Sequence, residues 1–427
     1  MTFFGSLIMY LYLMEVNMIF YYDETFHDRK ITQDKNGILN GYSKNSNDSF
    51  IYALVGFDEN SNLIDKYSKL ESRIKENLQL DKELKSTRFN KDNFEFGLKS
   101  MKRQCKDLYY DFLPLLIDSN FVFQVGMISK TEYVLRQLLD NINISIPIIE
   151  ESFVYSLTKF IERHRLNFLL NEAFIESNNN IQIFLEKLIE LLETVYVTIK
   201  DIPREEREAY AIKEHLFILK HSTIKNNNVI TSEWNYSFIA NGVYQRLSEL
   251  DSLNSKVFVD NEQKTYEAFT LKGLNAIQQD SINSIGVRIA DMFVGFVGKI
   301  VRSLKDDLSD PELNSLSDIK KEAYENRRLL SKEWFDIDQQ TFHLYKKIGH
   351  YFMNNATYWS SFTLSYFDDA AIFFWFFDYF DTYKCYNHYL NYMKKHVERF
   401  NSFCCSNLQS KYDEMVKKYY MNDMFLK

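Results

Sequence analysis

Runs of aromatic and β-branched residues predict several short β-strands in the first 300 positions. The runs at 18–25 and 50–57 have the composition that pleated strands favour. A polar stretch at 34–48, rich in Asn, Gly and Ser, lies between them, so we predict an antiparallel β-hairpin with a long loop. Similar runs predict three further strands, at 121–128, 255–260 and 276–281.

Apolar residues at helical spacing predict helices between and after these strands. Residues 63–80 carry one such repeat, with apolar side chains three or four positions apart. Helical spacing then continues almost without a break through 131–222. We interpret 131–222 as a large helical insertion that divides one sheet-containing domain into 18–130 and 223–305.

The stretch 285–300 predicts a helix with an unusual face. Asp291, Gly295 and Gly298 fall on that face at i, i+4 and i+7. Because each glycine inside a helix costs about 1 kcal/mol relative to alanine, the pair predicts close packing of another element. We expect this face to approach the sheet, with Asp291 directed at the ends of the strands.

The composition changes twice after residue 305. Residues 306–329 are polar and charged, which is typical of a linker between domains. Residues 330–427 are helical in pattern and rich in aromatic residues, so we predict an all-α C-terminal domain. Its most apolar run, 370–377, is shorter than the roughly 20 residues that cross a bilayer. We expect a buried helix there, or a helix that faces a protein partner.

The first 17 residues are apolar but are interrupted by Glu15 and Asn17, and they lead directly into the first predicted strand. We interpret 1–17 as an extension from an upstream start codon, with the functional beginning near Met14 or Met18. A membrane anchor is the alternative. We expect no membrane segment in the functional protein.

Composition narrows the class of protein. With 45% hydrophobic residues and only 4 Pro and 12 Gly in 427, we expect a globular and mainly helical chain rather than a strand-rich sandwich. The net charge of -8 provides no overall positive field for nucleic acid, so such a contact requires a local basic patch. The 4 cysteines form no Cys-x-x-Cys pair, which favours a reduced cytoplasmic protein without structural zinc.

Acidic residues recur where the predicted elements end. The leading candidates are Asp23, Glu83, Asp260 and Asp291. Several carboxylates repel one another unless cations neutralise them, and Mg²⁺ and Mn²⁺ prefer oxygen ligands. Two such ions about 3.5–4 Å apart stabilise the attacking and leaving oxygens when a phosphodiester bond is displaced. The pattern therefore predicts a two-metal site for Mg²⁺ or Mn²⁺.

Three neighbouring acids are secondary candidates. Glu24 directly follows Asp23 in a strand, so the two side chains point to opposite faces and only one is expected to reach the chemistry. Glu262 takes the place of Asp260 if that strand runs two residues further. Asp280 ends the next strand, where it and Glu24 are expected to be turn or supporting acids rather than ligands.

Basic residues near these acids suggest a rim for phosphate groups. Lys85, Arg88 and Arg288 are the substrate-binding candidates, with Lys299 and Arg302 beside them. The alternative is an ordinary surface of ion pairs. Glu83 has a similar alternative as a helix-end acid that pairs with Lys82, Lys85 or Arg88, an arrangement that contributes little to stability.

Short segments carry a family resemblance. They are Tyr-Tyr-Asp-Glu at 21–24, Glu-Leu-Lys-Ser at 83–86, Val-Phe-Val-Asp at 257–260, and Asp-Ser at 280–281 followed by Gly-Val-Arg-Ile-Ala-Asp at 286–291. Over roughly 18–305, the chain resembles the uncharacterised bacterial family called domain of unknown function 3800. That resemblance implies a ribonuclease H-like fold, and it links the chain to anti-phage defence because some members sit among defence genes.

The resemblance also implies roles for individual residues. It makes Asp23, Glu83, Asp260 and Asp291 resemble the metal-binding acids of the family, and Lys85 a nearby phosphate or structural contact. The chain departs from the family pattern at Val287-Arg288, which replaces Leu-Gln and offers a basic phosphate contact. It departs again at 25–27, where Thr-Phe-His replaces the commoner Ser-Gly and makes the loop beside Asp23 bulkier.

Together these features predict an α/β protein with a ribonuclease H-like mixed sheet, helices on both of its faces, a helical insertion and an all-α C-terminal domain. The predicted function is divalent-metal-dependent phosphodiester hydrolysis, as a nuclease on RNA or DNA in host defence. The alternative is a non-catalytic subunit that keeps the scaffold and binds a protein partner, or a second copy, through its C-terminal domain.

Overall fold

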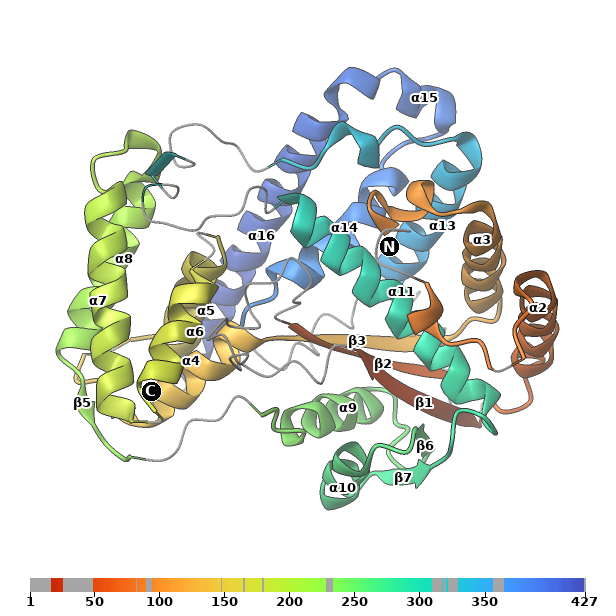
Figure 1. The fold of residues 1–427 in the computed structure, drawn as a ribbon, viewed down its shortest axis with the longest axis horizontal. Coiled ribbons are helices and arrows are strands. Elements are labelled where there is room, and N and C mark those ends of the chain that lie inside the picture. Colours follow the sequence, from red (N-terminus) through yellow and green to blue (C-terminus); the bar gives the residue numbers. More distant parts are fainter. Residues whose placement is uncertain are drawn as a thin grey trace.

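The computed structural model of the chain describes residues 17–25, 49–81, 83–89, 94–146, 148–163, 166–178, 180–227, 233–308, 317, 320–321, 329–355 and 365–425. Its centre is a five-stranded mixed sheet with the strand order β3-β2-β1-β6-β7 (Figure 1). These strands are β1 (Met18–Thr25), β2 (Ser49–Asp58), β3 (Val122–Ser129), β6 (Lys256–Val259) and β7 (Asn275–Gln278).

The pairing of the strands decides which side chains meet. β1 pairs antiparallel with β2, which confirms the predicted hairpin pairing, and β2 pairs antiparallel with β3. On its other side β1 pairs parallel with β6, Tyr22 opposite Val259, and β6 pairs parallel with β7. Because β1, β6 and β7 run in the same direction, their carboxyl ends lie at one edge of the sheet. The last strand ends at Gln278, so Asp280 lies beyond it.

Helices cover both faces of the sheet, as predicted. On one face, α2 (Leu63–Leu78), α3 (Arg103–Asp118) and α11 (Ile285–Leu308) enclose a hydrophobic cluster that includes Tyr21 and Ile51. On the other face, α9 (Ser237–Glu249) and α10 (Gln263–Leu271) pack over a cluster that includes Phe20 and Tyr22. The alternation of β1 residues between the two clusters is the period of two that a strand imposes.

The predicted insertion is helical and has a hydrophobic cluster of its own. Its main elements are α4 (Lys130–Asp140), α5 (Glu150–Arg163), α6 (Asn167–Glu176), α7 (Ile181–Ile199), η5 (Pro203–Glu205) and α8 (Glu206–Lys220). A short ladder between β4 (Ile142–Asn143) and β5 (Thr223–Ile224) joins the two ends of this segment. The chain thus leaves the sheet-containing part, forms a helical unit with its own hydrophobic cluster, and returns.

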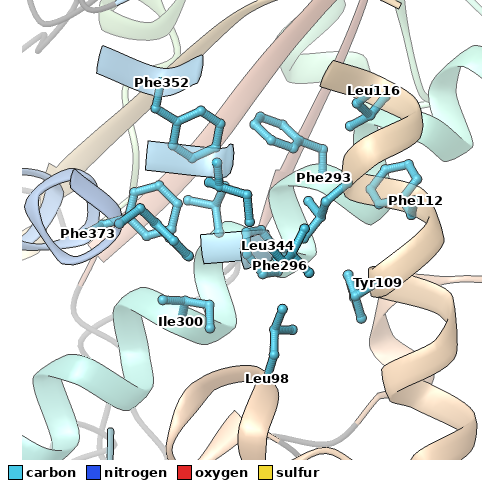
Figure 2. Packing of buried hydrophobic residues seen from close by; sticks show 14 of the residues in the cluster. Leu98, Tyr109, Phe112, Leu116, Phe293, Phe296, Ile300, Leu344, Phe352 and Phe373 are labelled. Atoms are coloured by element: carbon cyan, nitrogen blue, oxygen red, sulfur yellow. The ribbon is translucent and has the colours of Figure 1, made fainter. Parts of the chain in front are cut away.

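The C-terminal region is also helical, and most of its buried hydrophobic side chains among the described residues join the cluster that covers the sheet. Its elements are η6 (Lys332–Trp334), α13 (Gln339–Asn354), α14 (Asp368–Asp381), α15 (Tyr386–Leu390), η8 (Met393–Lys395) and α16 (His396–Phe425). Rings of α14 pack on α11, with 6.5 Å between the centroids of Phe296 and Phe373, in the same cluster as the sheet (Figure 2). Most of the run 370–377 thus belongs to the central core, while Ala371 and Trp375 pack in a smaller cluster with Tyr155 of α5.

Several predictions fall on residues outside the described part of the chain. They are the extension at 1–16, the hairpin loop at 34–48, His27, Lys82 and most of the expected linker at 306–329. Among the helices that are described, none combines the length and the apolar composition needed to cross a membrane. All four cysteines are free thiols.

Candidate functional site

β1 delivers its two acids to opposite faces of the sheet, as the alternation of a strand requires. Glu24 is buried on the α10 face, where its Oε2 accepts hydrogen bonds from the hydroxyls of Tyr22, at 2.6 Å, and Thr265, at 3.2 Å. Hydrogen bonds from these donors stabilise the buried carboxylate. Glu24 therefore has the surroundings of a structural acid, as expected for a supporting residue.

Asp23 lies on the α11 face, in a different environment. Its Oδ1 accepts a hydrogen bond of 2.8 Å from the backbone N–H of Glu24. Burial raises the pKa of Asp23 well above its ordinary value, and repulsion from the carboxylates of Asp291, Glu24 and Asp260 adds to the rise. Repulsion between carboxylates is the condition that a bound cation relieves.

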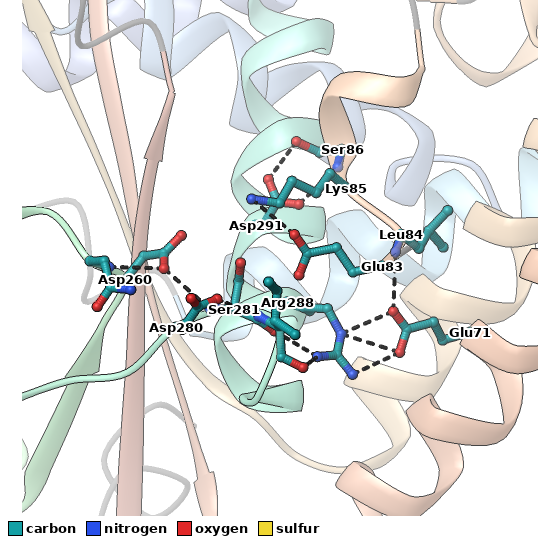
Figure 3. A network of polar contacts seen from close by, with 12 residues as sticks. Glu71, Glu83, Leu84, Lys85, Ser86, Asp260, Asp280, Ser281, Arg288 and Asp291 are labelled. Carbon is teal, nitrogen blue, oxygen red and sulfur yellow. Dashed lines mark hydrogen bonds and ion pairs between the residues drawn. The ribbon is translucent and has the colours of Figure 1, made fainter. Parts of the chain in front are cut away.

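Asp291 reaches this region from α11, and Ser86 holds its carboxylate. The backbone N–H of Ser86 donates to Oδ2 at 2.8 Å and its hydroxyl donates to Oδ1 at 2.6 Å (Figure 3). Burial raises the pKa of Asp291, while the bonds from Ser86 and the charges of Lys299 and Lys85 oppose that rise. Both oxygens of Asp291 are therefore fixed in orientation.

Two glycines of α11 create the close approaches that this arrangement needs. A Cβ at Gly295 would lie 2.2 Å from the Cβ of Ser86, so only glycine lets η2 (Ser86–Arg88) lie against the helix. A Cβ at Gly286 would lie 2.1 Å from the ring of Tyr21 on β1. The prediction that Gly295 brings the helix against the sheet was wrong, since its neighbour is η2 and the contact with the sheet is made at Gly286.

Glu83 lies just before η2 and pairs with Lys85. The Lys85 Nζ is 3.1 Å from Glu83 Oε1, while Glu83 Oε2 is buried without a hydrogen-bond partner. Partial burial disfavours the charged ammonium, but the hydrogen bond to Glu83 and the charges of Glu83, Asp260 and Asp291 outweigh it and raise the pKa of Lys85. The Lys85 ammonium thus lies in the field of three of the predicted metal-binding acids.

Asp260 directly follows β6, and its carboxylate joins two loops. Its Oδ1 accepts from the backbone N–H groups of Asn261, at 2.8 Å, and Ser281, at 3.2 Å. Asp280 uses its Oδ1 for the N–H of Ile282 at 2.8 Å, which makes it a turn acid. Glu262 lies at the N-cap of α10 rather than at the end of the strand.

Arg288 is held away from the surface. Its guanidinium is buried, pairs with Glu71 at 2.9 Å, and donates to the carbonyl oxygens of Ser281, at 2.6 Å, and Ile282, at 3.0 Å. Glu71 also accepts the backbone N–H of Leu84 at 3.3 Å. These contacts do not suit the predicted phosphate contact, and they make Arg288 a clamp on the loop between β7 and α11. Arg88, by contrast, is exposed.

Glu71 and Ser86 extend the predicted set, whereas Lys299 was predicted as part of the basic rim and lies beside Ser86 instead. Glu71 follows Tyr67 by four positions on the apolar face of α2, and a charged residue at such a position signals a buried partner. Lys299 donates to the carbonyl of Ser86 at 2.8 Å, and burial lowers its pKa to about 8 although Asp291 opposes the shift. Gly295 was the sequence signal for Ser86, because it indicates a close neighbour one turn after Asp291.

The polar contacts form one connected support for the acids (Figure 3). Leu84, Glu71, Arg288, Ser281 and Asp260 are linked in that order, so the segment that carries Glu83 is tied to the end of β6. The support joins Glu71 to Arg288, which lie 217 positions apart in the sequence. These contacts fix the backbone segments that carry Glu83 and Asp260.

The fit to a divalent cation is partial. Carboxylate oxygens suit Mg²⁺ and Mn²⁺, and the buried, unpartnered Oε2 of Glu83 is a vacant acceptor. Within the described residues, however, no three or more His, Cys, Asp or Glu side chains are arranged as a ready ligand set. Asp23 interacts through its charge with Asp260 and Asp291, but the four predicted acids do not form such a ligand set.

Comparison with known proteins leaves this geometry as the basis for any functional argument. No family model matches the chain, and no curated protein or solved structure matches it. The resemblance to domain of unknown function 3800 stays a prediction from the short segments quoted above.

Proposed function

We propose that the chain is a divalent-metal-dependent phosphodiester hydrolase that acts on nucleic acid. The observation that carries the proposal is the position of Asp23 at the carboxyl end of the central strand. Its charge is opposed by Asp260, from the neighbouring parallel strand, and by Asp291, from the helix packed on that face. Three acids from distant parts of the sequence gather at a half-buried position, which is costly for a protein unless cations bind there.

The architecture supports the same proposal. Three antiparallel strands followed by two parallel strands, with helices on both faces, are compatible with the ribonuclease H-like fold that the resemblance implies. We place the site at the edge where β1, β6 and β7 end. Loops that follow parallel strands at such an edge are common positions for binding residues.

Each acid has a defined part in this proposal. Asp23, Glu83, Asp260 and Asp291 would hold Mg²⁺ or Mn²⁺, which when bound activates water and neutralises charge on the reacting phosphate. Ser86 fixes the orientation of Asp291 by binding both of its oxygens. Glu24 stays outside this set because its hydrogen bonds lie on the opposite face.

The substrate is negatively charged, so positive groups near the acids matter more than the overall charge of -8. Arg88 is exposed on η2, and the Lys85 side chain is 43% exposed. We propose that these two residues contact the phosphates of RNA or DNA. Arg288 drops out of this role because its donors are used inside the protein.

The test compares cleavage of labelled single-stranded and duplex RNA and DNA in Mn²⁺ and in EDTA. Asp260→Asn is expected to lower the rate by more than about a hundredfold, as loss of a metal ligand does. Asp280→Asn is the matched control, because Asp280 lies at the same edge but serves a turn. Equal rates for wild type and Asp260→Asn, or cleavage that persists in EDTA, would reject the proposal.

Two observations favour a second function, a non-catalytic binding subunit. The described acids form no ready ligand set, and Lys85 already pairs with Glu83. The aromatic side chains of α14 are mostly buried, so the partner would bind elsewhere on the C-terminal region. Absence of Mn²⁺ binding by calorimetry, together with a stable complex recovered through the C-terminal helices, would support this function instead.

A further inference from the structure

Lys85 is placed where a cation is most needed. Its Nζ lies 3.1 Å from Glu83 Oε1, and its charge also interacts with Asp260 and Asp291. In Figure 3 its side chain extends from η2 toward Asp291 and Glu83. One ammonium group therefore pairs with Glu83 and interacts through its charge with two more of the four acids to which we assign metal binding.

The two lysines near Asp291 are held differently. Lys299 is anchored, since its Nζ donates to the carbonyls of Ser86, at 2.8 Å, and Gly295, at 3.4 Å. Lys85 makes its ion pair through a side chain that is 43% exposed. A lysine side chain on the edge of a site can turn into solvent without moving the backbone. Of these two lysines, Lys85 is thus the one whose ammonium group is able to move away from the acids.

We propose that Lys85 is an internal counter-ion, which neutralises the acids when no metal is bound and is displaced when a divalent cation binds. This inference rests on the proposed metal-dependent function. It explains why the described acids form no ready ligand set, because an ammonium bound to Glu83 holds one of the ligands to itself. Displacement returns Glu83 Oε1 to the site, beside the unpartnered Oε2.

The displaced side chain also has a defined destination. It starts next to Arg88, which is exposed on the same turn. An ammonium released there lies at the mouth of the acidic region, where a phosphate group of the substrate arrives. Metal binding would in this way convert a competitor for the acids into a contact for the substrate.

The experiment measures Mn²⁺ affinity of the full-length chain by isothermal titration calorimetry. Lys85→Met keeps the length of the side chain and removes its charge. We expect it to bind Mn²⁺ about tenfold more tightly than the wild type, because a neighbouring positive charge disfavours a second cation. Lys347→Met is the matched control, since Lys347 pairs with Asp118 at 2.6 Å and its side chain is 40% exposed. The control is expected to bind Mn²⁺ as the wild type does.

Thermal unfolding gives a second readout. In EDTA, Lys85→Met is expected to melt below the wild type, and in saturating Mn²⁺ this difference should disappear. If the wild type binds Mn²⁺ and Lys85→Met binds it equally or more weakly, Lys85 merely positions Glu83 and the inference is overturned while the proposed function survives. If neither protein binds Mn²⁺, both are overturned.

Discussion

The two sides of β1 treat neighbouring carboxylates in opposite ways. Glu24 meets the hydroxyls of Tyr22 and Thr265, so its charge is stabilised by donors within the protein. Asp23, one residue earlier, meets the charges of Asp291 and Asp260. A strand places consecutive side chains on opposite faces, and the sequence beyond the strand decides what each one meets.

This difference separates an acid that supports the fold from one that serves a site. Two hydroxyl groups of the protein donate to one carboxylate oxygen of Glu24, on the face of the sheet opposite the proposed site. The acids around Asp23 repel one another, which is unfavourable for the isolated protein. Proteins keep such arrangements mainly where function requires them.

The largest effect is expected from exchanging the two acids of β1 in turn. Asp23→Asn should lower the proposed nuclease activity by more than about a hundredfold, because it removes a proposed metal ligand. Glu24→Gln should keep most of the activity and destabilise the fold by about 1–2 kcal/mol, because it disturbs a buried hydrogen-bonded group. Paired rate and urea-unfolding measurements check both. Loss of activity in Glu24→Gln with Asp23→Asn unaffected would reverse the assignment.

A large loss of stability is expected from Arg288→Met. The change leaves Glu71 buried without its partner, which typically costs about 3–5 kcal/mol. Urea unfolding measures the loss, and the double variant Glu71→Leu/Arg288→Met should recover much of it because both charges are then absent. A stable Arg288→Met protein with weaker nucleic-acid binding would instead support the phosphate contact predicted from the sequence.

Gly295→Ala should reduce stability less, and it should affect only the face of β1 on which Asp23 lies. The new Cβ would collide with Ser86, so we expect a loss of about 1–3 kcal/mol and weaker Mn²⁺ binding as Asp291 loses its orientation. Adding Ser86→Gly removes the colliding atoms and should recover stability, without recovering the orientation of Asp291. Wild-type stability for Gly295→Ala would show that η2 does not pack tightly on α11.

The smallest effect is expected in the pH dependence of the metal-free protein. Folding raises the pKa of Asp23 above 3.8, so the native state binds this proton more tightly than the unfolded chain does. Stability contributed in this way is complete below the ordinary pKa and is lost as the pH rises toward the raised pKa. The free energy of unfolding, measured in EDTA, should therefore fall less steeply from pH 4 upward for Asp23→Asn than for the wild type. An identical slope for both proteins would contradict the raised pKa.

The sequence predicted the strands better than the helices that cover them. Strand β1 has the predicted ends, because its aromatic run is bounded by polar residues. Helices α9 and α10 were not predicted, since their apolar residues are too few to stand out from the polar positions around them. The aromatic run at 370–377 was recognised, but a sequence pattern does not tell whether a helix completes a neighbouring core or encloses its own.

The site divides in the same way. Repeated acids at the ends of elements made Asp23 and Asp260 recognisable, because a strand end is a local feature. Arg288 was given a phosphate contact because its partner Glu71 lies 217 positions away, and such a pairing depends on the fold. The contact of Ser86 with Asp291 was not predicted for the same reason, although Gly295 indicated that another element packs against the helix.

The anomalous scattering of manganese, in crystals of the wild-type protein soaked in Mn²⁺, tests most directly whether the acids around Asp23 bind a divalent cation. We predict a peak with carboxylate oxygens of Asp23, Asp260 and Asp291 at about 2.1 Å, as hard divalent cations require, and Lys85 turned away from Glu83. Crystals that show no manganese among these acids, with Lys85 still bound to Glu83, would contradict both metal binding by the acids and the displacement of Lys85.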